Sequence, residues 1–212
     1  MFITFEGIEG CGKTTQIKLL GDFLRSNGFP CVITREPGGT GIGEKIREIL
    51  LSPQNSEMDH VTELLLYMAS RAQHIEEVIR PSLAKKKVVL CDRFSDATIA
   101  YQGYGRGFDL QWLRKLDKLA ASGLRPDTTI LLDCPVEIGL ARAMERVSTQ
   151  GSQTTADRLE REDISFHRRV REGYLEIAGD EDVRVVVVDG AKQIDIVHED
   201  ICKIMSSKMT GS

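Results

Sequence analysis

The chain has 212 residues, of which 41% are hydrophobic and 28% charged, and its formal net charge is −4. These proportions are typical of a globular protein with a buried core, and they exclude a strongly basic surface that would attract nucleic acid or an acidic membrane. No run is long enough to span a membrane, and Met1 leads directly into an apolar segment, so we expect neither anchor nor leader. The five cysteines lack CxxC spacing and are not grouped with the four histidines, which favours free thiols, a cytoplasmic location and no zinc site.

Short β-branched apolar runs alternate with longer amphipathic stretches along the chain. The apolar runs, which we expect to form buried strands, are 2–5, 31–34, 88–91, 129–133 and 183–189. The amphipathic stretches, which we expect to form helices, are 13–26, 61–79 with its end at Pro81, 109–121, 136–147, 157–178 and 193–206. The alternation predicts one α/β domain over 1–212, with a five-stranded parallel sheet flanked by helices on both faces.

A glycine-rich loop lies between the first predicted strand and the first predicted helix. It fits the pattern G-x-x-x-x-G-K-[ST], in which backbone N–H groups point at phosphate oxygens. Its residues are Gly7, Ile8, Glu9, Gly10, Cys11, Gly12, Lys13 and Thr14, followed by Thr15. Lys13 would bridge the β- and γ-phosphates of a nucleoside triphosphate, and Thr14 would bind Mg²⁺. Glu9 is unexpected, because a carboxylate among these amides should weaken anion binding.

Charged residues follow the second and third predicted strands, at the edge where open α/β sheets bind ligands. The second strand leads into the turn REPGGT and then into a helix that carries Arg47. For Arg47, an ion pair with a glutamate of the same helix is the alternative to a ligand contact. After the third strand, Asp92 is well placed to hold Mg²⁺ through water, and Arg93 to bind an acceptor phosphate or the transferring group.

Five segments together resemble the thymidylate kinase family: FEGIEGCGKTT, TREPGGT, LLYMASRAQH, DRFSDATIAYQGYGRG and ADRLERED. They are spread over almost the whole chain. The resemblance implies the fold of the P-loop nucleoside monophosphate kinases and transfer of the γ-phosphoryl group of ATP to dTMP. The products would be ADP and dTDP, a precursor of dTTP, and the cofactor would be Mg²⁺. The resemblance also implies a homodimer.

The same resemblance implies a binding site for dTMP. Tyr67 would stack on thymine, and Arg71, four residues further along the helix, would hydrogen-bond the pyrimidine. Arg47 and Arg93 would bind the dTMP phosphate. The other acceptor contacts would come from Glu36, Pro37, Thr98, Tyr101 and Gln102. This chain departs from the family at Tyr67, where phenylalanine is expected, and at Ala97, where a polar residue is common.

The resemblance places Glu9 near the 3′-hydroxyl of dTMP, away from the phosphates of ATP. A second basic catalytic residue would then come from a lid at about 148–161, with Arg158 the better match and Arg161 its rival. An ion pair with a helix glutamate is the alternative role for Arg158. Arg142 would stack on adenine, or else lie at the surface, and the loop 189–193 would line the adenine side. The catalytic set is thus Lys13, Arg93, Arg158 and Glu9.

Three other functions stay open at this point. The chain could be another nucleoside monophosphate kinase, or a deoxynucleoside kinase, which would need a carboxylate base and have less use for Arg47 and Arg93. It could also be a nucleotide-binding regulator without turnover. No guanine-selecting N-K-x-D string occurs, which argues against a GTPase. The expected partners are ATP, dTMP and a second copy of the chain, with no nucleic acid and no membrane.

Overall fold

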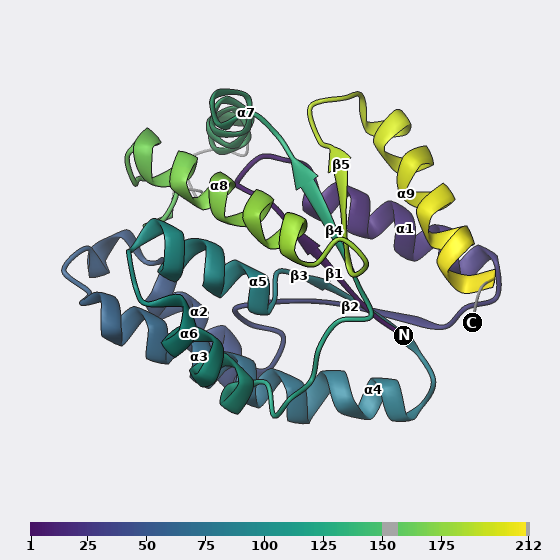
Figure 1. Ribbon diagram of the computed structural model, residues 1–212, viewed down its shortest axis with the longest axis horizontal. Helices are drawn as coiled ribbons and strands as arrows, with labels where there is room; N and C mark the ends of the chain where they lie inside the picture. The colour runs from purple at the N-terminus through teal and green to yellow at the C-terminus, as the bar shows by residue number, and fades with distance from the viewer. Residues whose placement is uncertain (150–156, 211–212) are drawn as a thin grey trace.

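Five parallel strands form one sheet, as the sequence predicted, and the structure shows their order to be β2-β3-β1-β4-β5 (Figure 1). The computed structural model describes residues 1–149 and 157–210. Within them the strands are β1 Phe2–Glu6, β2 Cys31–Arg35, β3 Val88–Asp92, β4 Thr128–Asp133 and β5 Val185–Asp189. The central strands are buried on both faces, and Ile3, Phe5 and Leu90 are fully buried. This is why these runs are almost uninterruptedly apolar.

Helices cover both faces of the sheet (Figure 1). The described helices before β3 are α1 Lys13–Ser26, α2 Gly41–Leu51, η1 Pro53–Asn55, α3 His60–His74, η2 Ile75–Ile79 and α4 Arg80–Ala84. Those after β3 are α5 Ser95–Thr98, η3 Ile99–Gly105, α6 Leu110–Ala120, α7 Val136–Thr149, α8 Ile164–Asp180 and α9 Ile194–Thr210. Helices α1 and α9 lie together on one face, whereas α8 and the π-helical segment η3 lie on the other. Within residues 1–149 and 157–210, no helix is both long and apolar enough to cross a membrane.

Three predicted helix boundaries were wrong. The helix over 193–206 continues as α9 to Thr210. The helix over 61–79 does not end at Pro81, because a π-helical turn leads directly into α4, which carries the proline near its start. The helix predicted over 157–178 begins only at Ile164. Before it, the Asp157 carboxylate accepts the N–H groups of Leu159 and Glu160, both at 2.9 Å, and thereby closes a local turn in place of a helix.

The strand order reverses at β1, which lies between β3 and β4. The chain runs from β1 out to β2, returns to β3, and then crosses to β4 on the other side. At such a reversal the carboxyl ends of the strands leave a crevice, which is where open α/β sheets bind ligands. The loops after β1, β2 and β3 therefore meet there, and these loops carry the charged residues that the sequence singled out.

The glycine-rich loop packs directly against α7. Gly10 has a φ of 68°, in the left-handed region that favours glycine, and a Cβ on it would lie 1.9 Å from the Gly139 carbonyl oxygen. A Cβ on Gly139 would in turn lie 2.5 Å from the Glu9 carbonyl oxygen. The backbone of α7 therefore sets the position of the loop, because no side chain fits between them.

Substituting Gly139 by alanine tests this contact. We expect Gly139→Ala to lower the free energy of unfolding by about 1–3 kcal/mol, because the added methyl group displaces the loop. Gly179→Ala is the matched control, since Gly179 is also helical and its Cβ would meet no atom within 4 Å. That variant should gain about 0.5–1 kcal/mol from helix propensity. Urea unfolding of both variants measures the difference, and equal effects would contradict the contact.

Candidate active site

The glycine-rich loop curls around the ammonium group of Lys13. Its Nζ donates hydrogen bonds to the carbonyl oxygens of Gly7 at 3.0 Å and Ile8 at 2.7 Å. Helix α1 begins at Lys13 and has no acidic residue in its first turn, so its free N–H groups and positive dipole end adjoin the loop. The loop is thus prepared for an anion, with one cation already buried in it.

Thr14 and Asp92 bring a hydroxyl and a carboxylate together beside this loop. Thr14 Oγ1 donates a hydrogen bond to Asp92 Oδ2 over 3.0 Å. Asp92 ends β3, the neighbour of β1, so the parallel pairing of these strands brings it to the loop. Hydroxyl and carboxylate oxygens of this kind would suit a hard divalent cation such as Mg²⁺.

Arg93, the residue directly after β3, is held from several sides. Its Nη1 donates to the Gly7 carbonyl oxygen at 2.9 Å and to the Tyr174 hydroxyl at 3.0 Å. Its Nη2 donates to Glu9 Oε1 at 2.9 Å, and its guanidinium lies 4.8 Å from the centre of the Tyr101 ring. Burial opposes the charge, but the surrounding hydroxyl and carboxylate oxygens hold the pKa of Arg93 well above its usual value. Arg93 is therefore a fixed cation.

Glu9 points into the protein and its side chain is 10% exposed. Its Oε1 accepts hydrogen bonds from Arg93 and from the Tyr101 hydroxyl, the latter at 2.5 Å, and its Oε2 lies 3.3 Å from Nδ1 of His167. Burial by itself would raise the pKa of Glu9, but Arg93, His167, Lys13 and Tyr101 hold it well below its usual range. Glu9 is therefore an anion directed at these groups.

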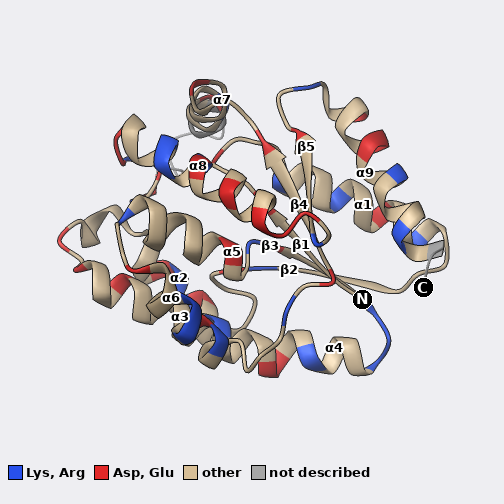
Figure 2. Ribbon diagram, in the orientation of Figure 1, with Lys and Arg blue, Asp and Glu red and all other residues tan. Residues whose placement is uncertain are grey.

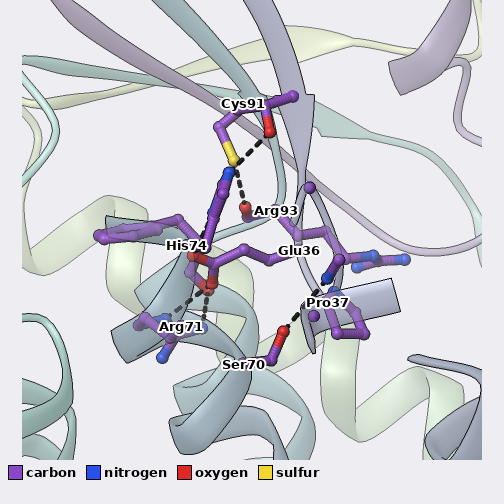
Figure 3. A network of polar contacts seen from close by, with 12 residues as sticks. Glu36, Pro37, Ser70, Arg71, His74, Cys91 and Arg93 are labelled. Atoms are coloured by element: carbon purple, nitrogen blue, oxygen red, sulfur yellow. Dashed lines mark hydrogen bonds and ion pairs between the residues drawn. The ribbon is translucent and has the colours of Figure 1, made fainter. Parts of the chain in front are cut away.

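The Glu36 carboxylate lies between two residues of α3, Arg71 and His74 (Figure 3). Its Oε2 accepts from Arg71 Nε at 2.8 Å, and its Oε1 lies 3.0 Å from His74 Nδ1. The other donors of Arg71 bind Thr98 Oγ1, Asp117 Oδ1 and the Phe94 carbonyl oxygen. Arg71 is 2% exposed, and burial opposes its charge, but Glu36 and Asp117 raise its pKa above the usual value. Most donors of this predicted base-binding arginine are thus engaged within the protein.

Arg47 extends from α2 back to the loop after β2, where its Nη1 donates to the Pro37 carbonyl oxygen at 2.9 Å. Glu44, a candidate partner of Arg47, is paired with Arg35 at 2.8 Å. Burial, together with the nearby charge of Arg35, lowers the pKa of Arg47. An anion bound beside Arg47 would offset both effects.

A cavity of about 960 Å³ joins these groups. The predicted site residues that line it are Glu9, Gly10, Gly12, Lys13, Thr14, Thr15, Glu36, Pro37, Arg47, Tyr67, Arg71, Asp92, Arg93, Thr98, Tyr101, Gln102 and Arg142. Ala97 lines it as well, and the remaining loop residues Gly7, Ile8 and Cys11 are not among its described lining residues. Lysines and arginines are interspersed with acidic residues along nearby helices such as α8 (Figure 2). The positive groups that line the cavity come from several elements, among them α1, α2, α3 and α7.

The π-helical segment η3 carries two of these lining residues, Tyr101 and Gln102. Gln102 Nε2 donates to Glu63 Oε1 at 2.9 Å, which fixes its amide against α3. Tyr67, on the same helix as Glu63, has a raised pKa because burial and the nearby Glu63 charge disfavour its phenolate. Its neutral ring thus faces the cavity from α3.

Arg142 connects α7 to the loop after β5. Its Nη1 donates to the Gly190 carbonyl oxygen at 2.8 Å, and its Nη2 to that of Ala191 at 3.0 Å. These two hydrogen bonds hold the loop 189–193 beside Arg142, which lines the cavity. Residues 189–193, which the resemblance placed on the adenine side, are not themselves among the described lining residues.

Arg158, the predicted lid cation, is bonded within the protein to Glu63 of α3 and to Leu50 of α2. It is 7% exposed, its Nη2 lies 2.5 Å from Glu63 Oε2, and its Nε donates to the Leu50 carbonyl oxygen at 3.0 Å. Among the described residues, the cavity is lined by its neighbours Asp157, Leu159 and Glu160 but not by Arg158. A buried guanidinium requires a carboxylate, and Glu63 supplies it. Much of the predicted lid, residues 150–156, lies outside the described part of the chain.

Sequence reasoning missed four buried residues around the site: Glu6, Glu63, His167 and Tyr174. Tyr174 contacts Arg93, His167 contacts Glu9 and Glu63 contacts Gln102, in each case from a distant position in the chain. Glu6 bonds Tyr174 and the N–H group of Phe94, the residue after Arg93. Glu6 could have been noticed as a lone acidic residue at the end of an apolar strand. The other three sit on helices, where nothing in the local pattern separates them from ordinary surface or core positions.

A parallel sheet with a phosphate-binding loop after β1, opening into a cavity of about 960 Å³ lined by Lys13, Arg47 and Arg93, defines the class of P-loop nucleotide-binding proteins. The model of one family, thymidylate kinase, matches residues 5–201. The chain belongs to the thymidylate kinase family.

Relatives named thymidylate kinase match over nearly their full length. The chain is 53% identical over 211 residues to the thymidylate kinase of Geotalea daltonii, covering 100% of this chain and 99% of that protein. It is 52% identical over 208 residues to that of Geobacter sulfurreducens, covering 98% and 97%. The crystal structure of thymidylate kinase from Ehrlichia chaffeensis superposes with a TM-score of 0.76 at 38% identity, covering 97% of this chain and 98% of that one. The activity of the family, transfer of the γ-phosphoryl group of ATP to dTMP to give dTDP, is therefore the activity of this chain.

The buried charge of Glu9 predicts a pH-dependent stability. Glu9→Gln is expected to lower the free energy of unfolding at pH 7 by about 1–3 kcal/mol, because it weakens the hydrogen bonds to Arg93 and Tyr101. Since the pKa of Glu9 is lowered in the folded protein, this difference is complete above about pH 5 and shrinks as the pH falls. Urea unfolding between pH 7 and pH 3 measures it. The control is Glu57→Gln, at an exposed position, which should show no such trend.

Proposed function

We propose that the cavity binds ATP and dTMP end to end, with Glu9 and Arg93 at the boundary between the two sites. The observation that carries this proposal is the Arg93–Glu9 ion pair, because both residues line the cavity and Glu9 belongs to the loop that holds Lys13. Lys13 and Thr14 then face the phosphates of ATP. Arg47 and Tyr67 lie on the acceptor side.

The acceptor site would contact both the base and the sugar of dTMP. Tyr67 presents a neutral ring on which thymine would stack, between groups from Pro37, Thr98 and Gln102. Arg71 would use its remaining N–H toward the pyrimidine while Glu36 and Asp117 hold it in place. Glu9 would accept a hydrogen bond from the 3′-hydroxyl, beside the Tyr101 ring. This role explains why a carboxylate is tolerated in a phosphate-binding loop.

No general base is required for the transfer, because the dTMP phosphate is already ionised at neutral pH. The residues therefore act by alignment and by charge. Arg93 and Arg47 would hold the acceptor phosphate in line, and Lys13 and Arg93 would stabilise the charge that develops on the transferring group. Lys13 would exchange its present hydrogen bonds with Gly7 and Ile8 for phosphate oxygens.

Mg²⁺ would be held by Thr14 Oγ1 and, through water, by Asp92. The 3.0 Å hydrogen bond between these side chains supports this, because it brings two oxygen ligands to the loop that receives the phosphates. When bound, Mg²⁺ neutralises charge on the β- and γ-phosphates.

The adenine of ATP would lie against Arg142 and the loop 189–193, which share two hydrogen bonds.

We further propose that the chain is one domain with a lid at about 148–161. Asp157, Leu159 and Glu160 line the cavity and support this. The lid cation would be Arg158, after leaving Glu63, or Arg161. Comparing kcat of Arg158→Ala with that of Arg161→Ala separates the two.

The protein would work in the cytoplasm as a homodimer. Its five cysteines are all free, which suits a reducing compartment, and recovery of the protein in another cell fraction would contradict that location. Helices α2 and α3 contact each other and expose large apolar residues. These residues are Ile42, Ile49, Val61 and Leu65, with exposed fractions of 45–54%. Such a face suits a second copy of the chain.

Replacing Arg93 by alanine tests the assignment of the two sites. We expect Arg93→Ala to lower kcat at least about 100-fold and to weaken dTMP binding, while the Kd for ATP changes less than about threefold. A coupled assay of ADP release measures turnover on dTMP, dUMP, AMP, GMP, CMP and thymidine, and calorimetry measures binding. A large loss of ATP affinity would show that Arg93 belongs to the ATP site and not to the dTMP site. Faster turnover on another acceptor would contradict the assignment of dTMP as the substrate.

A charge on the exposed face of α3 tests the dimer. Leu65→Lys is expected to raise the dimer dissociation constant at least about tenfold, because the lysine would be buried at the interface. Leu119→Lys on α6 is the control, since Leu119 is 77% exposed and lies outside this face. Sedimentation equilibrium measures both variants. A monomeric wild type, or equal shifts in both variants, would rule out this interface.

A further inference from the structure

Two buried residues beneath Arg93 have no part in the mechanism described above. Glu6 is the last residue of β1 and is fully buried, and Tyr174 is on α8 and is 2% exposed. Neither lines the cavity among the described residues. A carboxyl group in the core is costly unless its oxygens are bonded, so its partners indicate what it is for.

The first link from Glu6 and Tyr174 to Arg93 runs through side chains. The Tyr174 hydroxyl accepts a hydrogen bond from Arg93 Nη1 at 3.0 Å and donates one to Glu6 Oε2 at 2.8 Å. Arg93 Nη1 has one other acceptor, the Gly7 carbonyl oxygen. The Tyr174 hydroxyl thus fixes the guanidinium from the core side, opposite the cavity, and Glu6 fixes the hydroxyl.

The second contact runs through the backbone. Arg93 has a φ of 68°, a left-handed value that is rare for a residue other than glycine. The next N–H group, that of Phe94, donates to Glu6 Oε1 at 2.7 Å, and the Arg93 N–H donates to the Phe5 carbonyl oxygen at 2.9 Å. The turn that directs Arg93 away from β3 is therefore held by the carboxyl group that also holds Tyr174.

Charge is consistent with this arrangement. Burial, reinforced by Asp96, raises the pKa of Glu6 to about 8, whereas Arg93, Tyr174 and the Phe94 N–H act in the opposite direction. The groups that oppose the effect of burial are the ones that Glu6 holds in place.

We propose that Glu6 and Tyr174 are positioning residues, which fix the backbone and the guanidinium of Arg93 in the orientation that binds the acceptor phosphate. This rests on the role proposed for Arg93. Glu6 acts on the turn through the Phe94 N–H and on the guanidinium through the Tyr174 hydroxyl. Neither residue lines the cavity among the described residues, and the Tyr174 hydroxyl acts on it through Arg93.

Tyr174→Phe removes only the hydroxyl and is the primary test. We expect kcat/KM for dTMP to fall about tenfold, because Arg93 loses one of its fixed contacts, and the Kd for ATP to stay within about twofold. Tyr104→Phe is the matched control, since Tyr104 packs against Gly173, next to Tyr174, and lies outside the contacts of Arg93. Thermal unfolding of both variants verifies that they fold. Equal kinetics of the two variants would overturn the proposal.

The Arg93→Ala background distinguishes positioning from a general packing role. There we expect Tyr174→Phe to change the Kd for dTMP by less than about twofold, since the residue it positions is gone. Glu6→Gln should resemble Tyr174→Phe, and the two together should be no worse than the stronger single change. A loss from Tyr174→Phe that persists without Arg93 would overturn the inference. If Arg93→Ala itself leaves dTMP binding and kcat intact, the proposed role of Arg93 fails instead.

Discussion

Two opposite charges, on Arg93 and Glu9, face each other over 2.9 Å in a largely buried site. Charges removed from water are stable only when their other donors and acceptors are also satisfied. Arg93 therefore binds Gly7 and Tyr174 as well, and Glu9 also binds Tyr101. Because these partners come from the glycine-rich loop, η3 and α8, one ion pair holds several segments around the cavity.

The same constraint explains how the cavity can hold two nucleotides that carry many negative charges. Arg47 and Arg93 are held in place by carbonyl, hydroxyl and carboxylate oxygens of the protein. Fixed cations in a site shielded from water stabilise phosphate charge more than mobile ones, because they need not reorganise during the reaction. The buried Glu36–Arg71 pair gives the base side of the cavity a similar rigidity.

Much of the site could be predicted because its signals are local. The glycine-rich loop is a contiguous motif, and Asp92 and Arg93 directly follow an apolar run, so strand order alone brings them together. Arg158 shows what a local signal cannot predict. The sequence around an arginine near a loop does not reveal whether its partner is a phosphate or, as in the structure, a glutamate of α3. The start of α8 was missed for a related reason, since the Asp157 turn competes with helix over the same residues.

By itself, the sequence determined the parallel α/β sheet, the phosphate-binding loop and the family, because each depends on residues adjacent or periodically spaced in the chain. Only the tertiary structure decided that Glu9 is buried against Arg93, Tyr101 and His167, and that Glu6 and Tyr174 lie beneath Arg93. These pairs are separated by 81 to 168 residues. Contacts at such separations arise only when the strands and helices pack together, and no local pattern encodes them.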